Sequence, residues 1–477
     1  MRPVASLQRE NLSEDFMHSK TMILGVVLLF WLTGCAADRS NTAFPEPRPL
    51  GTDLPAFRPP ARPEEAAQKQ IEIEAPAGAV TLRQALALAL MRNPELRAFS
   101  WEVRAQEATT LQAGLFHNPS IGADLQDLGV SASPESVPQP QATLTLSQII
   151  ELGGKRTKRR EAAALSRDLA GWDYEAKRIE LFTQVSQTFT DLLRAQQQRA
   201  LTEETIRLAE ETARVVSERV KAGKVSPIEE IRANVVLASA GIERDRAGKE
   251  LEAARKRLAA TWGSATPRFD KAEGTLGAVS PIPSLAQLTE RLSKNPELAR
   301  WVTEIAQRRA VIDLERSRAI PDLTMMGGFR RYETTGDNVF IVGLSVPLPI
   351  FNRNQGGIQE SRHRLSKGEE ERRAAEARVS AALSEAYRAL STAHVEATSL
   401  EEKVLPGAAQ AFEAVNEGYR LGKFGLLDVL DAQRTLFGSR AQHLRALADY
   451  HQAVAEVERL IGEPLEGGGQ GSGTGDQ

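Results

Sequence analysis

Residues 379–404 read VSAALSEAYRALSTAHVEATSLEEKV, and this stretch decides the fold class. Its apolar and small residues recur at alternating steps of four and three, at Val379, Leu383, Ala386, Leu390, Ala393, Ala397, Leu400 and Val404. Heptad spacing of this kind keeps one seam facing a partner helix, so it predicts coiled-coil packing. Pro406 follows the stretch and is expected to kink the helix locally.

A proline-free stretch, residues 154–221, predicts an even longer helix earlier in the chain. Apolar residues recur in it at three- and four-residue steps, at Leu169, Trp172, Ala176, Ile179 and Phe182. A helix of about 65 residues spans roughly 100 Å, which few globular domains can house. The composition agrees, because aromatic residues make up only 5% of the chain while Ala, Glu, Arg and Leu are plentiful, as is typical of long helices.

The chain is internally duplicated with a period of about 200 residues. Residues 81–84 (TLRQ) and 284–287 (SLAQ) each place a hydroxyl residue three positions before Gln, the pattern of a capping box at a helix start. Each is followed by the same four residues, NPEL, at 93–96 and 295–298. Further pairs keep the order and nearly the same offset: Pro119 with Pro321, Leu146 with Leu344, Gly223 with Gly422, and Trp262 with Ile461.

Each copy also contains two short segments in which apolar and polar residues alternate. The apolar positions are Ile121, Ala123 and Leu125, then Ala142, Leu144 and Leu146 in the first copy, and Leu323, Met325 and Phe329, then Phe340, Val342, Leu344 and Val346 in the second. Alternation gives a strand one apolar and one polar face, which fits either a half-buried sheet or a membrane barrel strand. Each copy therefore reads helix, helix, strand, strand, long helix, long helix.

Four strands in one chain are too few to close a membrane barrel. Open sheet edges are not tolerated inside a bilayer, so a membrane location would require several chains to share one barrel. Three chains would contribute twelve strands. The expected fold is mainly α-helical, with a membrane β-barrel that closes only in an oligomer.

The N-terminal region resembles a lipoprotein export signal. The apolar stretch from Thr21 to Gly34 follows Lys20 and is too short to span a bilayer, which needs about 20 apolar residues. It fits the apolar region of a signal peptide. Its end, residues 32–35 (LTGC), resembles a lipobox, in which Cys35 becomes the lipidated first residue of the mature chain. The alternative is a buried core cysteine that happens to follow an apolar run.

These features divide the chain into five expected segments. They are a signal peptide (1–34), a lipidated, proline-rich extended segment (35–80), a first repeat (81–263), a second repeat (284–463) and a glycine-rich disordered tail (464–477). Met17 is an alternative start, because the residues before it lie upstream of a compact signal. Ala36, in place of Asp after the cysteine, favours sorting to the outer membrane by resemblance to enterobacterial lipoproteins.

Three stretches resemble the TolC-like outer-membrane factor family, and the resemblance extends over roughly residues 80–463. They are residues 146–156 (LSQIIELGGKR), 346–356 (VPLPIFNRNQG) and 419–433 (YRLGKFGLLDVLDAQ). Within the family the chain looks most similar to the cobalt–zinc–cadmium resistance branch, the CzcC-like proteins. The resemblance implies a homotrimer with a twelve-stranded barrel in the outer membrane and a helical tunnel across the periplasm. A periplasmic membrane-fusion adaptor and an inner-membrane RND-type pump would dock at the far end.

The function that this resemblance implies is a channel subunit of a tripartite efflux system for divalent heavy-metal cations, and not an enzyme. A channel for drugs or other organic compounds is the alternative within the same fold, because no residue pattern selects a metal. A lipid-anchored periplasmic coiled-coil structural or adaptor protein is the alternative from another class. The paired amphipathic strands weigh against it, since an adaptor has no need of them.

Two helix–turn–helix tips are candidates for adaptor contact. The first contains Gly223, Lys224, Val225 and Ser226, and the second contains Gly422, Lys423 and Gly425. Glycine suits the position after the last helical residue, and Ser226 with Glu229 has capping-box spacing. Well-formed turns would explain these residues without any partner. The family's matching tips meet the adaptor and form the closed end of the tunnel.

Asp428 and Asp431 follow the second tip, and the family's matching acids line the constriction at the periplasmic end. Three chains would place a ring of carboxylates there, which attracts cations and rejects anions. The alternative for Asp428 is the third position of a helix, where the dipole favours an acid. Phe424 would either add an apolar constriction or pack the turn.

A basic cluster at Lys155, Arg156, Lys158, Arg159 and Arg160 opens the first long helix, and Arg353 lies at the comparable point of the second copy. Cations at a helix start oppose the macrodipole, so something else should compensate them. We expect either contact with lipid phosphates of the outer membrane or a plain solvated face. Nucleic acid is not an expected partner, because the chain is exported and its net charge is −3.

No metal or cofactor site is expected from the sequence. The six histidines are scattered, and although His443 and His451 fall near one face of a helix, no third ligand accompanies them. No nucleophile constellation or phosphate-binding loop is visible either. The chain would act as a conduit, with the choice of metal made by the pump and the adaptor.

Overall fold

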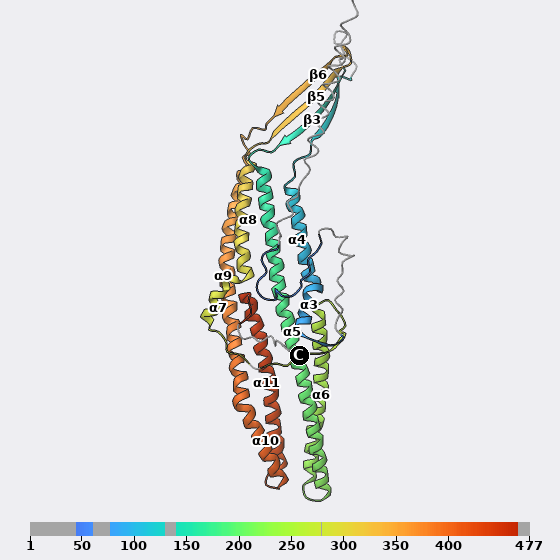
Figure 1. Cartoon of the computed structure of the whole chain (residues 1–477), viewed down its shortest axis with the longest axis vertical. Coiled ribbons are helices and arrows are strands. Elements are labelled where there is room, and N and C mark those ends of the chain that lie inside the picture. Colours follow the sequence, from blue (N-terminus) through green and yellow to red (C-terminus); the bar gives the residue numbers. More distant parts are fainter. Residues whose placement is uncertain (1–43, 61–76, 129–139, 278, 466–477) are drawn as a thin grey trace, which may run out of the picture. The chain divides into compact units, whose positions relative to one another are not determined.

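The computed structural model describes residues 44–60, 77–128, 140–277 and 279–465, which all lie in one compact unit. The expected signal peptide, Cys35 and the glycine-rich residues after Leu465 fall outside the described residues. The described chain is mainly helical and carries two small sheets (Figure 1). Among the described residues, no helix combines the length and the hydropathy that a membrane-crossing helix needs.

The same order of elements occurs twice along the chain, as the sequence predicts. The first half contains α3 (Leu82–Arg92), α4 (Pro94–Ala113), β2 (Ser120–Gln126), β3 (Gln141–Ile150), α5 (Lys155–Lys221) and α6 (Pro227–Ala260). The second contains α7 (Leu285–Arg291), η1 (Leu292–Lys294), α8 (Pro296–Arg318), β5 (Leu323–Tyr332), β6 (Asn338–Ser345), α9 (Gln355–Ser399), η2 (Leu400–Val404), α10 (Leu405–Arg420) and α11 (Leu426–Ile461). Strands β1 (Gly78–Val80) and β4 (Phe269–Ala272) pair in parallel beside the first half.

The repeated NPEL sequence makes the same pair of hydrogen bonds in each half. Asn93 accepts a bond from the first turn of α4 (2.9 Å), and its amide donates to the carbonyl of Thr261 at the end of α6 (2.8 Å). Asn295 accepts from the first turn of α8 (3.1 Å) and donates to the carbonyl of Leu460 in α11 (2.8 Å). Both side chains are buried. Each asparagine therefore caps one helix and fixes the end of another.

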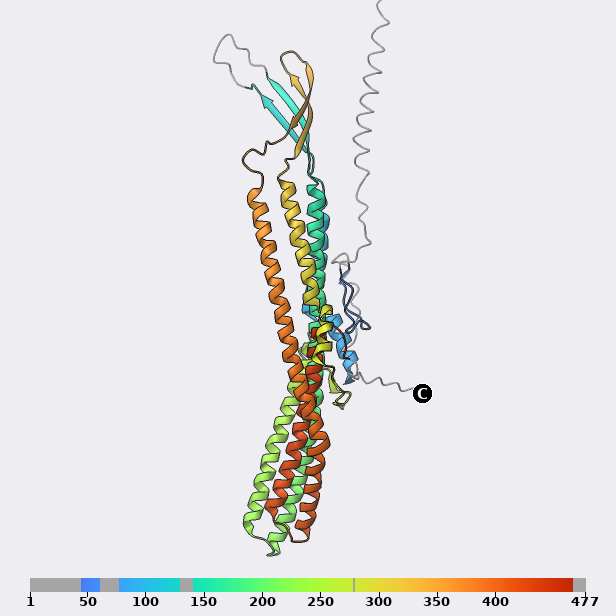
Figure 2. The same cartoon turned by 90° about the vertical axis from the view of Figure 1, so that its left-hand side faces the viewer.

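Helix α5 is the central element of the unit. It is a single helix of 67 residues, as the proline-free stretch predicts, and it packs against α4 and α8 towards one end and against α6 and α11 towards the other (Figures 1 and 2). The largest buried cluster surrounds the middle of α5, where α3, the β1–β4 pair and residues 44–60 lie against it. A second buried cluster joins α7, α9 and α11.

The predicted heptad seam of α9 is buried from Val379 to Leu400 and then ends. Val404 is 41% exposed, because the π-helical turn η2 intervenes before α10 begins at Leu405. The prediction of a seam residue at Val404 is therefore wrong. Pro406 lies in the first turn of α10, directly after the π turn. Proline lacks an N–H and crowds the preceding turn, so the regular helical ladder is interrupted here.

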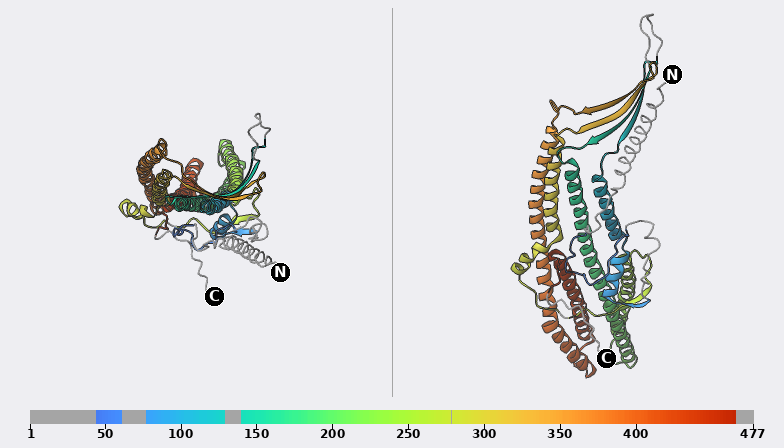
Figure 3. Two further views of the ribbon diagram at one scale, coloured as in Figure 1. Left: turned by 90° about the horizontal axis from the view of Figure 1, so that it is seen from above. Right: turned by 45° about the horizontal axis from the view of Figure 1, so that its top comes forward.

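Strands β2, β3, β5 and β6 form an antiparallel sheet in that order, beyond the ends of α5 and α8 (Figure 3). The register gathers the apolar positions of all four strands on one face, in cross-strand rows such as Ile121–Leu146–Gly327–Val342 and Ala123–Leu144–Phe329–Phe340. Much of this apolar face is open in the chain, with Ile121 76% and Phe340 88% exposed. Polar residues such as Thr145 lie on the other face. The sheet thus has an apolar face that no part of the described chain covers.

Candidate functional site

The two helical hairpins, α5–α6 and α10–α11, end in turns that lie at the same end of the unit (Figure 2). Gly223 and Gly422 have φ angles of +69° and +73°. The N–H groups of Lys224 and Lys423 each donate to the carbonyl five residues earlier, at 2.9 and 2.7 Å. This geometry closes a helix with a left-handed residue, which explains glycine at both positions. The predicted tip residues therefore form two matching turns.

The helices that follow the two turns begin differently. The Ser226 hydroxyl accepts a bond from the N–H of Ile228 (3.4 Å), but the carboxylate of Glu229 does not return to Ser226. The expected capping box is therefore wrong, because neither of its two bonds forms: the hydroxyl accepts from the second helical residue and not from the N–H of Glu229. At the second tip one half of a capping box is present, since Asp428 Oδ2 accepts from the N–H of Gly425 (2.9 Å).

The two acids after the second tip have different surroundings. Asp428 is exposed and uses one carboxylate oxygen to cap the turn, while its other oxygen has no hydrogen bond within the described chain. Asp431 is exposed as well and pairs with Arg434 of the same helix at 2.6 Å. Exposed pairs of this kind are weakly held, so the Asp431 charge is only partly offset. Neither acid is buried in the single chain.

Phe424 packs onto α10 within its own tip. Its side chain is 47% exposed, and its ring lies so close to Gly418 that a methyl group there would collide with it. The neighbouring Tyr419 is buried, and the guanidinium of Arg219 lies 4.6 Å from its ring centroid. This cation–π contact links the second tip to α5. In the single chain, Phe424 therefore has the packing role that the sequence left as an alternative.

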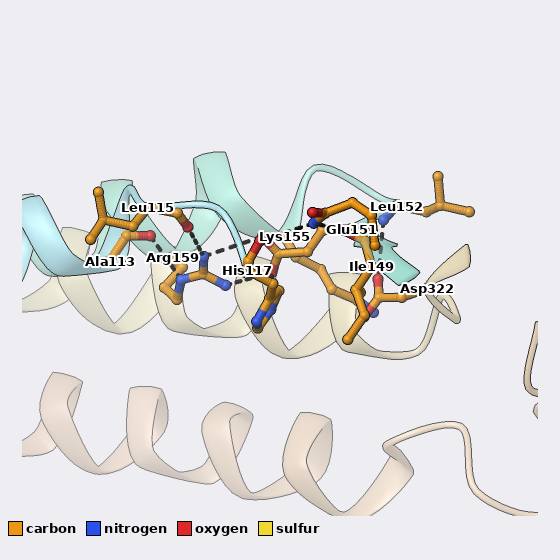
Figure 4. Close-up of polar contacts among 10 residues, drawn as sticks. Ala113, Leu115, His117, Ile149, Glu151, Leu152, Lys155, Arg159 and Asp322 are labelled. Atoms are coloured by element: carbon orange, nitrogen blue, oxygen red, sulfur yellow. Dashed lines mark hydrogen bonds and ion pairs between the residues drawn. The ribbon is translucent and has the colours of Figure 1, made fainter. Parts of the chain in front are cut away.

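At the other end of α5, the basic cluster receives the compensation that its position requires. Lys155 donates to Asp322 Oδ1 at 2.7 Å, and Arg159 pairs with Glu151 at 2.6 Å (Figure 4). The hydrogen bond from Arg159 is the main cause that holds the pKa of Glu151 below its usual value. Arg159 also donates to two backbone carbonyls, those of residues 113 and 115. These two cations therefore hold the strand-to-helix junction together.

The remaining cations of the cluster are more available. The guanidinium of Arg156 lies 3.8 Å from the ring centroid of Phe116, and Arg353 Nε donates to the carbonyl of Pro349 (3.1 Å). Within the part of the chain that the structure describes, the side chains of Lys158 and Arg160 form no hydrogen bond or ion pair. Exposed apolar side chains accompany these cations at the junction, namely Phe116, Leu348, Ile350 and Phe351.

One buried ion pair of α5 is absent from the sequence-based predictions. Glu175 and Arg178 lie 2.8 Å apart with side chains only 3% and 5% exposed. Arg178 donates to the carbonyls of Leu50 and Arg48, and the N–H of Arg48 donates to Glu175. The pair therefore fixes residues 44–60 to α5. An acid and an arginine three positions apart on an apolar helical face are the signal that indicates it.

Among the described residues, no group of three or more His, Cys, Asp or Glu side chains is placed to hold a metal ion. His451 lies with its Nε2 atom 3.4 Å from the carbonyl of Gly277, and burial lowers its pKa. His443 faces a cavity that Arg440 and Glu204 also line. The two histidines thus have separate surroundings.

Comparisons with known proteins agree with this geometry. The model of the family described as "Outer membrane efflux protein" matches residues 85–264 and 288–463. The chain is 36% identical over 386 residues to the cobalt-zinc-cadmium resistance protein CzcC of Cupriavidus metallidurans, which covers 81% of this chain and 91% of that protein. It is 28% identical over 293 residues to the nickel-cobalt-cadmium resistance protein NccC of Alcaligenes xylosoxydans xylosoxydans, covering 61% and 65%.

A likeness of fold extends to solved structures. The CmeC outer membrane channel of Campylobacter jejuni is similar with a TM-score of 0.69 and 16% identity, and the match covers 91% of this chain and 92% of that one. At this identity the likeness concerns the fold alone.

Proposed function

This chain belongs to the outer membrane efflux protein family, and we propose that it is the outer-membrane channel subunit of a tripartite RND-type efflux system for divalent heavy-metal cations. The observation that carries the channel is the four-stranded sheet. Its apolar residues are aligned on one face and exposed, and both of its edge strands, β2 and β6, lack a neighbour on their outer side in the described chain. A sheet of this kind is stable in a bilayer only when copies of the chain complete it.

In the proposed assembly, three copies form a twelve-stranded barrel, and their helical hairpins form a tunnel across the periplasm. The apolar face of the sheet would face lipid and the polar face would line the pore, as membrane barrels require. Cys35, which lies outside the described residues, would carry the lipid anchor after the signal peptide (1–34) is removed. Two repeats, 81–263 and 284–463, would build each third of the tunnel.

The tips are the proposed contact with the periplasmic adaptor and, through it, with the inner-membrane pump. Lys224 and Lys423 are exposed on turns that backbone hydrogen bonds hold in place, so they present a defined surface. The free oxygen of Asp428 would join a carboxylate ring at the closed end, with Asp431 one turn further along α11. Such a ring favours cations over anions. Phe424 would narrow the same constriction.

The cargo is proposed from the relatives named for resistance to cobalt, zinc, cadmium and nickel. Export of an organic compound is the second candidate, and it is favoured by the 23% identity over 416 residues to the pyoverdine export outer membrane protein OpmQ of Pseudomonas aeruginosa. The lower identity ranks it second. A coiled-coil structural protein is disfavoured, because it would leave the apolar face of the sheet in water.

The free members of the basic cluster are proposed to contact phosphates of the inner leaflet of the outer membrane. Lys158, Arg160 and Arg156 lie in the first two turns of α5, which follows β3 after a short connection, and Arg353 lies just before α9. The exposed Phe351 and Phe116 beside them fit the interface between hydrocarbon and headgroups. Lys155 and Arg159 contribute less to this contact, because their charges are already paired.

A charge placed on each face of the sheet tests the barrel. Phe340→Asp and Val342→Asp lie on the apolar face, whereas Ile341→Asp lies between them on the polar face. A basic side chain facing lipid costs about 2–4 kcal/mol near the bilayer centre and an acidic one costs less but is still unfavourable, so the first two variants should be recovered less well in outer membranes than wild type. Ile341→Asp should be recovered like wild type. Equal recovery of all three variants would contradict the barrel.

A further inference from the structure

We propose that the π-helical turn η2, together with Pro406, is the pivot on which the α10–α11 tip moves to open the tunnel. The inference rests on the proposed channel function and adds the device that positions the gate. The pivot belongs to the second hairpin alone. Movement about this pivot would displace Phe424 and Asp428, whereas the first tip would stay fixed at the end of the continuous helix α5.

The heptad phase of the second long helix changes at the π turn. Before it, the buried positions run through Leu390, Ala393, Ala397 and Leu400. A continued heptad would next use positions 404, 407, 411 and 414, and all four are exposed. The positions that are buried or half-buried are instead Leu405, Ala408, Phe412, Val415 and Tyr419, each one residue later. The π turn supplies this one extra residue.

The first half of the molecule has no such turn. Helix α5 remains α-helical from Lys155 to Lys221. Its residues Gln197 and Leu201 line the same cavity as Leu405, so they lie at the level of the π turn. The two halves otherwise share their order of elements, their capping asparagines and their tip turns. The π turn is therefore a difference between two matched hairpins, and it falls on the one that carries Asp428 and Asp431.

Packing between the hairpins thins on the tip side of the turn. On the sheet side, Ala397, Leu400 and Ala446 belong to the large cluster around α5. On the tip side, the described residues that join the two hairpins in a buried cluster are few: Ala213, Val216, Ala233, Tyr419, Leu426 and Val429. Closely packed interiors transmit strain and resist movement, whereas a thin contact allows it.

Two grooves, both open to solvent in the single chain, lie between the hairpins over the same span. One, of about 470 Å³, is lined by Leu405, Arg440 and His443 together with residues of α5. The other, of about 540 Å³, is lined by Leu430, Gln433 and further residues of α5, α6 and α11. Together they give the α10–α11 hairpin room to swing against α5–α6.

Three buried polar atoms, two of them on residues that line these grooves, lack partners among the described residues. Gln433 is 5% exposed, and its Oε1 atom has no donor among the described residues. Thr398 Oγ1, just before the π turn, and His443 Nε2 are buried and unpartnered as well. An unpaired buried polar group raises the energy of the state that contains it. If the α10–α11 hairpin moved, these atoms would lose no hydrogen bonds. They therefore do not hold the hairpin in its present position.

The π turn can be removed without disturbing the seam. Deletion of Glu402, which is exposed, brings Leu405 and every later seam residue onto the phase of α9, and Pro406→Ala restores the missing N–H. The double variant should therefore form one continuous α-helix with unchanged packing. Glu402→Ala is the matched control, because it alters the same residue and keeps the π turn.

The test is single-channel recording of purified full-length trimers in planar bilayers. Wild type and the Glu402→Ala control should switch between a low and a high conductance level. The double variant, with Glu402 deleted and Pro406→Ala, should resist heat as wild type does but open at least ten-fold less often. Wild-type switching in the double variant would overturn the pivot. A wild-type protein that conducts no ions would overturn the channel function, and with it the pivot.

A second measurement needs no variant and decides the matter if the double variant does not assemble. Hydrogen exchange of the wild-type trimer should be at least ten-fold faster at residues 400–405 than at residues 197–204 of α5, which lie at the same level. Regular backbone bonding protects the α5 residues, whereas a pivot opens locally. Equal protection of the two segments would overturn the proposal.

Discussion

The asparagines of the two NPEL sequences show how single residues connect the duplicated halves. Each side chain serves a helix start and a helix end that are more than 160 positions apart in the chain. The sequence identifies the repeated residues and their capping role. It does not identify the second bond, because the acceptors Thr261 and Leu460 lie in elements whose position only the tertiary fold determines.

Asn93→Ala and Asn295→Ala should each destabilise the protein by about 2–3 kcal/mol, because each loses a buried cap and leaves a buried carbonyl unpaired. Thr81→Ala removes an exposed cap and should cost about 1 kcal/mol. Urea unfolding of the detergent-solubilised protein measures the difference. A cost for the asparagine variants no greater than that of Thr81→Ala would contradict the double role.

Glu458 predicts a dependence of stability on pH. Burial raises its pKa from 4.5 to about 7, and its side chain accepts a bond from the N–H of Leu465. A group with a raised folded pKa binds its proton more tightly in the folded state, so its acid form stabilises the fold. This contribution is complete below the unfolded pKa and is lost as pH rises through the folded value.

Glu458→Gln should therefore be more stable than wild type at pH 8, by about 3 kcal/mol, and the difference should shrink towards zero as the pH falls to about 5. Glutamine keeps the acceptor for Leu465 and cannot ionise. Thermal unfolding at the two pH values measures the effect. The same shift at both pH values would show that the ionisation of Glu458 does not limit stability.

Substitutions in the second tip can distinguish the capping role of Asp428 from the effect of its charge. Asp428→Asn keeps an oxygen for the N–H of Gly425 and removes the negative charge, whereas Asp428→Ala removes both. We expect Asp428→Asn to leave the tip folded and to reduce the preference for cations several-fold in planar bilayers. Asp431→Asn should have a smaller effect, because Arg434 already offsets that charge. Unchanged cation selectivity in Asp428→Asn would show that Asp428 only caps the turn and does not contribute to ion selection.

The basic cluster separates into two pairs with different expected phenotypes. Neutralising Lys158 and Arg160 to glutamine should reduce the lipid phosphate retained per purified trimer without changing the unfolding midpoint. Neutralising Lys155 and Arg159 leaves Asp322 and Glu151 without their partners, and should destabilise the junction by about 2 kcal/mol for each bond lost. Phosphate analysis and urea unfolding distinguish them. If the variant of Lys158 and Arg160 retained as much lipid phosphate as wild type, the proposed contact with lipid phosphates would be wrong.

The elements also show where sequence patterns stop being informative. Period-two alternation predicted all four strands, and the absence of proline predicted the length of α5, because both signals are local. The heptad seam predicted α9 but continued through Val404, since a periodic pattern assumes an unbroken helix. A change of phase by one residue between Leu400 and Leu405 was the available signal for the π turn.

For the whole molecule, the internal duplication and three motifs led to the correct family, which the matches to residues 85–264 and 288–463 confirm. The assembly is harder to derive from one chain. If several chains share a barrel, each single chain shows only a sheet with an uncovered apolar face and two open edges. The partners of the basic cluster, Asp322 and Glu151, were also hidden, because one lies in the opposite half and the other belongs to the preceding strand connection.

In the proposed function, this chain carries divalent metal ions through the outer membrane. The most direct test is growth of a deletion strain on graded cobalt, zinc, cadmium and nickel, beside a panel of dyes and antibiotics, with the wild-type chain supplied in trans. The deletion strain should be sensitive to the divalent metals alone, and the wild-type chain should restore its growth. Sensitivity to the organic compounds alone, or to neither group, would contradict the proposed function.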